Sequence, residues 1–142
     1  MDRESLEKIA DFAQKHDLVV ISDEIYCDLT YEGTHTCFAS LPGMKERTLT
    51  MNGFSKSYAM TGLRVGYICG PREIMEQIYK VHQYEILCAS VTSQYGAIAA
   101  LKYCDDDVKA MYDEYAARRE MGYEGLKKIG LSVFKPKGAF YI

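Results

Sequence analysis

The segment from Thr48 to Gly66, TLTMNGFSKSYAMTGLRVG, carries the residue types in this chain that are best suited to chemistry. Its two ends have the composition of short strands, and its middle is a polar stretch that contains Ser55 and Lys56. Gly53, three residues before the lysine, allows the backbone to bend tightly. Arg64, eight residues after the lysine, adds a second fixed cation. The segment therefore predicts a turn between two strands that presents an amine beside a bound anion.

A second group of polar residues follows the apolar run Leu18–Ile21. This run is rich in β-branched residues, a pattern typical of a strand that is buried on both faces in a parallel sheet. After the run come four polar residues: Ser22, Asp23, Glu24 and Tyr26. Because ligands bind at the carboxyl ends of the strands in open α/β sheets, these residues are candidates for a binding site.

The elements that must position these residues follow from periodicity and from helix-end signals. In the first half of the chain we expect a helix over 2–16 with Asp2 as its N-cap, a strand over 18–21, a surface connection over 30–47, and strands over 48–52 and 65–69. In the second half we expect a helix that has Pro71 at its first position, a break over 90–93, and a small-residue helix over 94–103. A long helix from Asp105 to about residue 128 should stop at Gly130, and a strand-like segment should follow over 131–142. Since a helix followed by a buried strand indicates an α/β unit, the predicted fold class is α/β.

Composition excludes several classes of protein. With 48% hydrophobic and 26% charged residues over 142 positions, the chain has the content of one globular domain or part of one. A net charge of -3 without a run of Lys and Arg argues against nucleic-acid binding. No apolar run is long enough for a membrane span, and the charged opening residues do not resemble a signal peptide. We expect a cytoplasmic protein.

The five cysteines are scattered along the chain, with no C-x-x-C pair and no histidine at metal-ligand spacing. Free thiols in a reducing compartment are therefore expected, and no metal site is predicted. The three histidines are expected at the surface or in packing positions, not in catalysis: His16, His35 and His82.

Four segments of this chain resemble consecutive motifs of the class I/II aminotransferases, which are pyridoxal-phosphate-dependent enzymes of fold type I. In chain order they are ISDEIYCDL, NGFSKSYAMTGLRVGY, GPREIMEQI and PKGAFYI. The aspartate and aromatic aminotransferase subgroup is the most similar. The match extends over nearly the whole chain. A single piece such as Ser-Lys would be a weak signal, but several pieces in the right order are specific.

The resemblance implies a role for each candidate residue around pyridoxal 5'-phosphate. Lys56 matches the lysine that forms a Schiff base with the cofactor aldehyde and later carries a proton between the substrate and the cofactor. Asp23 matches the carboxylate that pairs with the pyridine nitrogen, and Tyr26 the tyrosine that hydrogen-bonds the phenolic oxygen of the cofactor. Arg64 matches the arginine that holds the phosphate.

This chain departs from the family pattern at one phosphate contact. Many members have a serine three residues before the lysine, where this sequence has Gly53. The resemblance therefore moves the hydroxyl contact to Ser55. Other residues lie next to the expected site without an assigned role: Glu24, Asn52 and Tyr58.

The resemblance also implies a division of the chain. Residues 1–130 correspond to the second half of the cofactor-binding large domain, which has a mainly parallel sheet flanked by helices, and to the long connecting helix. Residues 131–142 correspond to the start of the small domain. Together with the strand-like segment at the end of the sequence, this leads us to expect the central part of a larger protein, which as a whole is a homodimer.

Three hypotheses for function follow. The first is an aminotransferase that moves an amino group from an amino acid to a 2-oxo acid in a ping-pong cycle. The second is a fold type I carbon-sulfur lyase, which has similar motifs but often a histidine at the position of Tyr26. The third is that these 142 residues alone are catalytically inert and bind the cofactor weakly, because part of the site is missing.

Overall fold

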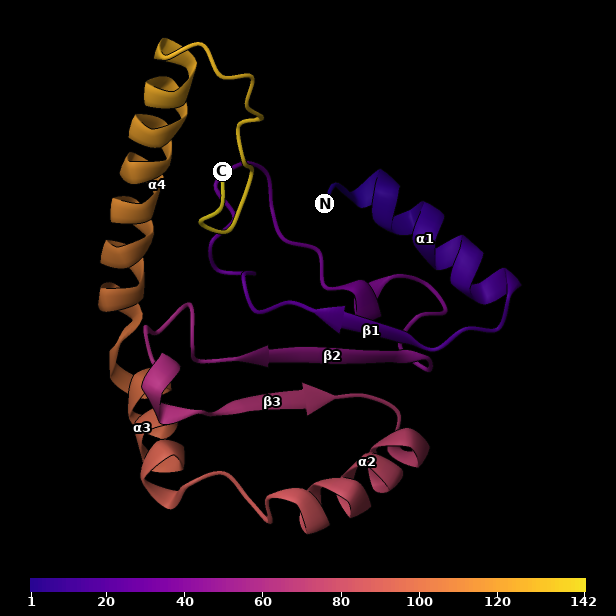
Figure 1. Ribbon diagram of the computed structural model, residues 1–142. Helices are drawn as coiled ribbons and strands as arrows, with labels where there is room; N and C mark the ends of the chain where they lie inside the picture. Colours follow the sequence, from indigo (N-terminus) through magenta and orange to yellow (C-terminus); the bar gives the residue numbers. More distant parts are fainter.

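The computed structural model describes all 142 residues, and it arranges helices around a small three-stranded sheet (Figure 1). In chain order the elements are α1 (Arg3–Lys15), β1 (Val20–Asp23), the 3-10 helix η1 (Phe38–Ser40), β2 (Thr48–Gly53), the 3-10 helix η2 (Thr61–Leu63), β3 (Gly66–Cys69), α2 (Arg72–Glu85), α3 (Val91–Tyr103) and α4 (Asp105–Lys128). The α/β class is confirmed.

The sheet has the order β1-β2-β3, with one parallel and one antiparallel pairing. β1 and β2 run parallel, so that Val20 lies opposite Thr48 and Asp23 lies opposite Met51. β2 and β3 run antiparallel, and their pairing ends where Gly53 meets Gly66. The polar turn with the lysine connects two strands, as the sequence predicts, and the structure shows that these strands are antiparallel neighbours.

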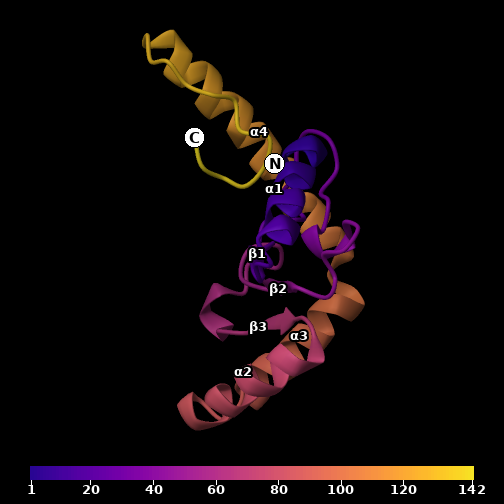
Figure 2. The same cartoon turned by 90° about the vertical axis from the view of Figure 1, so that its right-hand side faces the viewer.

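The long axis of the molecule is set by the helices. α1 lies beside β1 and α2 lies beyond β3, while α4 extends away from the sheet (Figure 1). The view turned by 90° shows the sheet in the middle, with α4 projecting toward one end and α2 toward the other (Figure 2). The chain after α4 returns along this helix toward the residues that follow β1 (Figure 1). None of the helices combines the length and the apolar character that crossing a membrane requires.

One core cluster lies between α1 and the connection that precedes β2. α1 begins as predicted, since the side chain of Asp2 accepts a hydrogen bond from the Ser5 backbone N–H at 2.9 Å. Its buried face meets apolar residues of the connection, and the cluster consists of Ala10, Ala13, Phe38, Leu41 and Met44. The prediction that residues 30–47 run over the surface is therefore wrong in part. Three of its apolar side chains fill the space between α1 and the sheet, although they follow no helix or strand periodicity.

A second core cluster joins the lysine turn to α3. Phe54, at the start of the turn, is buried against Ala97 and Ala100 of α3. The small side chains of Ala97 and Ala100 permit this close approach. α3 therefore supports the lysine turn, although its sequence has almost no amphipathic pattern.

The prediction that Leu18–Ile21 is buried on both faces is wrong. The strand begins at Val20, which packs on the core beside α1, whereas Ile21 on the opposite face is 66% exposed. β1 is an edge strand of the sheet, and only one of its faces is covered. Alternation of side chains along the strand then leaves the other face open.

Residues 131–142 do not form the predicted strand. Their β-type pairing is limited to one isolated antiparallel bridge between Thr30 and Gly138. Pro136 lacks a backbone N–H and Ala139 has a φ of 60°, so a regular ladder cannot continue through this segment. The division of the chain at residue 130 stays a prediction.

The helix boundaries agree with the sequence in part. α4 spans Asp105–Lys128, and Gly130 after it has a φ of 87°, as expected for a helix stop. Pro71 is the N-cap of α2 and not its first residue. α3 begins at Val91, inside the predicted break, because Ser90 is the N-cap of this helix.

Substitution of Gly53 by alanine tests the close contact between β2 and β3. A Cβ atom at Gly53 would lie 2.9 Å from the Cα of Gly66 and 3.1 Å from the carbonyl oxygen of Val65. Since backbone atoms cannot move aside easily, we expect Gly53→Ala to lower the free energy of unfolding by about 1–3 kcal/mol. Urea unfolding followed by far-UV circular dichroism measures this change.

Gly62→Ala is the matched control in the same turn. A Cβ atom there meets no heavy atom within 4 Å. This variant should change the free energy of unfolding by less than about 0.5 kcal/mol. Equal effects of the two substitutions would contradict the packing argument.

Candidate functional site

All five predicted site residues line one cavity of about 420 Å³: Asp23, Tyr26, Ser55, Lys56 and Arg64. The remaining lining residues are Ile25, Met51, Asn52 and Thr61. The cavity lies where β1 and β2 end, because parallel strands bring their carboxyl ends to the same edge of a sheet. Its volume is in the range typical of small-ligand sites.

The lysine turn is held by its own backbone and by burial of two side chains. The carbonyl oxygen of Phe54 accepts hydrogen bonds from the backbone N–H groups of Tyr58 and Met60, at 3.3 and 3.2 Å. Phe54 and Ser57 are buried. Lys56, between them, is half-buried and lines the cavity. The turn therefore fixes the amine with respect to the sheet.

Gly53, at which the sequence predicts a tight bend, and Gly62 later in the turn do not occupy its left-handed positions. Neither glycine has a positive φ, and the left-handed positions of the turn are Ala59 (φ 52°) and Arg64 (φ 51°). Non-glycine residues in this conformation store strain, which is common at functional sites. One guanidinium nitrogen of Arg64 donates to the carbonyl oxygen of Thr61 at 2.8 Å. Its other N–H groups stay available for an anion, since an arginine has five donors.

Asp23 is the last residue of β1, which ends two positions later than the strand predicted over 18–21. Its Oδ1 accepts a hydrogen bond from the backbone N–H of Ile25 at 3.1 Å. This local turn holds the carboxylate at the cavity, and the second carboxylate oxygen stays free to accept from a ligand.

The phenol of Tyr26 is held by aromatic neighbours. Its hydroxyl lies 2.9 Å from the hydroxyl of Tyr141, and its ring meets the ring of Phe140 edge-on at a centroid distance of 5.2 Å. Burial, the interactions with Tyr141 and the nearby Asp23 carboxylate together raise the pKa of Tyr26 to about 12. At neutral pH this residue is therefore a neutral phenol, able to donate a hydrogen bond.

The amine of Lys56 lies beside the rings of Tyr26 and Phe140. Its Nζ is 6.0 Å from the ring centroid of Tyr26 and 5.6 Å from that of Phe140. The sequence did not identify Phe140 and Tyr141 as site residues, because they are far from Lys56 along the chain. The sequence signal for them is the family motif PKGAFYI, which lies in the segment predicted to be strand-like.

Asn52 also proves to be part of the cavity wall. Its Oδ1 accepts from the backbone N–H of Gly53 at 2.7 Å, and its Nδ2 donates to the Sγ of Cys27 at 3.2 Å. The side chain thus connects the end of β2 to the residues that follow β1. Burial raises the pKa of the Cys27 thiol, so this sulfur is a packing group and not a thiolate at neutral pH.

Glu24 points away from the cavity and into the core, where its carboxylate is 7% exposed. It accepts hydrogen bonds from the Ser22 hydroxyl and the Phe38 backbone N–H, both at 3.0 Å, and its Oε2 lies 2.7 Å from the Nε2 of His35. Burial alone would raise the pKa of Glu24, but the hydrogen bonds from His35, Phe38 and Ser22 outweigh it and lower the pKa. Glu24 therefore anchors the end of β1 to the connection over residues 35–38.

The cavity combines groups that bind complementary parts of a ligand. The Lys56 amine can attack a carbonyl carbon, and the Asp23 carboxylate can pair with a cationic ring nitrogen. The Tyr26 phenol can donate to an oxygen, while Arg64 and the Ser55 hydroxyl can hold a phosphate. Together they suit an anionic heteroaromatic aldehyde.

Comparison with known proteins gives one family over the whole chain. The family model described as aminotransferase class I and II matches residues 1–142. A putative aminotransferase, YugH, of Bacillus subtilis (strain 168) is 47% identical over 139 residues, which are 98% of this chain and 36% of the relative. The aspartate aminotransferase of Pyrococcus abyssi is 46% identical over 147 residues, with 100% of this chain and 37% of the relative covered.

Solved structures have the same fold over this region. The aromatic aminotransferase from Pyrococcus horikoshii OT3 superposes with a TM-score of 0.94 at 44% sequence identity, covering 98% of this chain and 38% of that structure. A Thermus thermophilus aspartate aminotransferase single mutant gives a TM-score of 0.90 at 36% identity, covering 96% and 36%. The chain thus spans little more than a third of the length of the proteins that it matches.

The buried carboxylate of Glu24 should make the fold sensitive to acid. Its pKa in the folded chain is below the ordinary value of 4.5. Its contribution to stability is therefore fully present above about pH 4.5 and is lost as the pH falls through the folded pKa. In Glu24→Gln we expect about 1–3 kcal/mol less stability at neutral pH, and a smaller further loss on acidification than in the unmodified chain.

Urea unfolding at a series of pH values between about 7 and about 3 measures both effects. Glu4→Gln is the control, since the Glu4–Lys8 pair is exposed and should contribute less than about 0.5 kcal/mol. A similar acid dependence in the unmodified chain and in Glu24→Gln would contradict the assignment.

Proposed function

Because the chain belongs to the class I and II aminotransferase family, we propose that it supplies the lysine-bearing side of the site of a pyridoxal-phosphate-dependent aminotransferase. The reaction moves an amino group from an amino acid to a 2-oxo acid. The convergence of Asp23, Tyr26, Ser55, Lys56 and Arg64 on one cavity is the observation that supports this proposal.

The residues present fit the groups of pyridoxal 5'-phosphate. Its aldehyde suits the amine of Lys56, and its ring nitrogen suits the carboxylate of Asp23. Its phenolic oxygen suits the Tyr26 hydroxyl, which is neutral at physiological pH because the pKa of Tyr26 is about 12. When bound, the cofactor supplies an electron-accepting ring beside the reacting carbon.

Lys56 has two tasks in this proposal. Its amine binds the cofactor aldehyde covalently until the amino group of a substrate takes its place. The released Lys56 amine would then move the proton from the substrate α-carbon to C4′ of the cofactor. The buried neighbours of Lys56 in the turn keep the amine in place between these steps.

Arg64 and Ser55 are the proposed phosphate contacts. The guanidinium of Arg64 is held at one nitrogen by Thr61, which orients its remaining donors. Gly53 replaces the serine of many family members, and the position of Ser55 in the cavity wall supports a shift of the hydroxyl contact to this residue.

The proposed substrates are an amino acid and a 2-oxo acid. The relatives are named as aminotransferases, and no feature of the cavity favours carbon-sulfur cleavage. The two reactions differ in their products, because a lyase releases pyruvate and ammonia from a cysteine conjugate.

A cytoplasmic location and a homodimer complete the proposal. All five cysteines are free thiols, which suits a reducing compartment. Many large apolar side chains of α2 and α3 are exposed, among them Tyr84, Tyr95 and Leu101. Such a surface favours association with further protein.

Covalent trapping tests the role of Lys56. After incubation with pyridoxal phosphate and reduction with borohydride, we expect a pyridoxyl group on Lys56, detected by peptide mass spectrometry. Lys56→Arg should lose the label at this position, because a guanidinium does not form the bond. Lys80→Arg on α2 is the control and should keep it. Equal labelling of exposed lysines and of Lys56 would contradict the proposal.

Removal of the Arg64 charge tests the phosphate contact. Arg64→Gln should weaken the binding of pyridoxal phosphate to the chain about 10-fold to 100-fold, since a charge-assisted hydrogen bond is lost. Arg72→Gln is the control, because Arg72 forms only an exposed pair with Glu76. Absorbance titration measures both variants, and an unchanged affinity in Arg64→Gln would contradict the assignment.

Amino transfer to a 2-oxo acid tests the reaction itself. We expect the 142 residues alone to bind the cofactor weakly and to transfer amino groups slowly, because they hold only the contacts described above. Release of pyruvate and ammonia without amino transfer would favour the lyase.

A further inference from the structure

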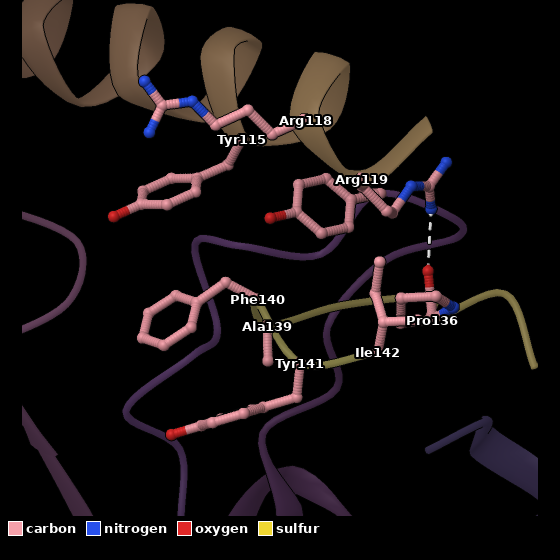
Figure 3. A pocket seen from close by; sticks show the side chains of 9 residues that line it. Tyr115, Arg118, Arg119, Pro136, Ala139, Phe140, Tyr141 and Ile142 are labelled. Atoms are coloured by element: carbon pink, nitrogen blue, oxygen red, sulfur yellow. Dashed lines mark hydrogen bonds between the residues drawn. The ribbon is translucent and has the colours of Figure 1, made fainter. Parts of the chain in front are cut away.

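The segment over residues 136–142 is fastened to the chain that follows β1. The backbone N–H of Tyr31 donates to the carbonyl oxygen of Lys137 at 2.9 Å, and the N–H of Ala139 donates to the carbonyl oxygen of Leu29 at 2.9 Å. On the other side, a guanidinium nitrogen of Arg119 donates to the carbonyl oxygen of Pro136 at 2.8 Å (Figure 3). Hydrogen bonds to the backbone of this segment from two directions therefore fix it.

Two aromatic residues project from the fastened segment toward the lysine. Figure 3 shows the ring of Phe140 between the rings of Tyr115, from α4, and Tyr141. Phe140 stacks on Tyr115 at a centroid distance of 5.6 Å and meets Tyr26 edge-on. The ring positions are therefore set by packing, and the amine of Lys56 lies 5.6 Å from the Phe140 ring.

A phenol held by its ring alone can still rotate its hydroxyl group, so the direction of its proton needs a separate partner. For Tyr26 the structure provides one, since its hydroxyl lies 2.9 Å from that of Tyr141. We propose that Tyr141 is a positioning residue that holds the Tyr26 hydroxyl at the cavity beside Lys56. This inference rests on the proposed function, in which Tyr26 donates to the phenolic oxygen of the cofactor.

The pair can serve both states of the site. Without a ligand, the two hydroxyl groups share one hydrogen bond, in which Tyr26 can donate its proton to Tyr141. When an acceptor oxygen enters the cavity, Tyr26 can turn its proton toward it while Tyr141 donates to the oxygen of Tyr26. A chain of hydrogen bonds in this direction strengthens the donor at its end. Tyr26 thus keeps a partner throughout.

The electrostatic surroundings favour the neutral form. The groups that face Tyr26 are the Asp23 carboxylate and the Tyr141 phenol, and the Lys56 amine lies 6.0 Å from its ring centroid. Burial contributes most to the raised pKa of Tyr26, and the hydrogen bond to Tyr141 follows. Loss of the Tyr141 hydroxyl should therefore lower this pKa.

Nuclear magnetic resonance of the unloaded chain, labelled with ¹³C at the ζ carbon of tyrosine, tests the inference. The Tyr26 signal is assigned from Tyr26→Phe. In Tyr141→Phe we expect the acid dissociation constant of Tyr26 to rise about tenfold, which is about one pKa unit. Tyr115→Phe is the matched control: it also changes a phenol beside Phe140, but it leaves the Tyr26–Tyr141 hydrogen bond in place. An unchanged Tyr26 titration in Tyr141→Phe overturns the inference.

A second variant keeps the test valid if Tyr141→Phe alters the fold. In Ala139→Pro the new residue cannot adopt the φ of 60° and lacks the N–H that donates to Leu29. The segment should detach, and the acid dissociation constant of Tyr26 should rise at least as much. A Tyr26 signal that titrates as in the unmodified chain also overturns the inference. Failure of borohydride trapping at Lys56 in the unmodified chain would instead reject the proposed function, so the two failures are distinguishable.

Discussion

The close contact between the backbones of β2 and β3 is the constraint on which the site depends. The two strands pair up to Gly53 and Gly66, where there is no room for a side chain between them. The chain between these glycines must therefore leave the sheet. It leaves on the side of α3, where Phe54 is buried. The position of Lys56 follows from this backbone geometry. A flexible side chain on an open loop would lose more conformational freedom on binding a ligand.

β1 contributes the opposite part of the cavity through its parallel pairing with β2. Because the strands run in the same direction, Asp23 lies opposite Met51, close to the start of the lysine turn. Successive side chains of a strand point to opposite faces. Asp23 therefore lines the cavity, while Glu24 enters the core and accepts hydrogen bonds from Phe38 and His35. Two adjacent carboxylates thus have different roles, one facing a ligand and one holding the strand end.

Local patterns in the sequence predict much of this arrangement. Apolar runs and polar residues indicate the strands and the turn, and Asp2 and Gly130 mark helix ends correctly. Burial is less predictable, because it depends on what covers a surface: Ile21 is exposed on an edge strand, while Met44 in an irregular connection is fully buried. The bend at Arg64 also has no sequence signal, since arginine disfavours the left-handed conformation that it adopts here.

The contact between Tyr26 and Tyr141 could not be predicted from local sequence patterns for another reason, because these residues are 115 positions apart along the chain. The aromatic and β-branched content of residues 131–142 suggests a strand, but Pro136 and the left-handed Ala139 prevent a ladder. The backbone groups of this segment are then satisfied by the chain around Leu29 and by Arg119. The ring of Phe140 then packs beside the amine of Lys56. The aromatic residues that would stabilise a sheet edge thus form one wall of the lysine site. They can do so because the backbone of the segment bonds to Leu29 and Arg119 and not to a neighbouring strand.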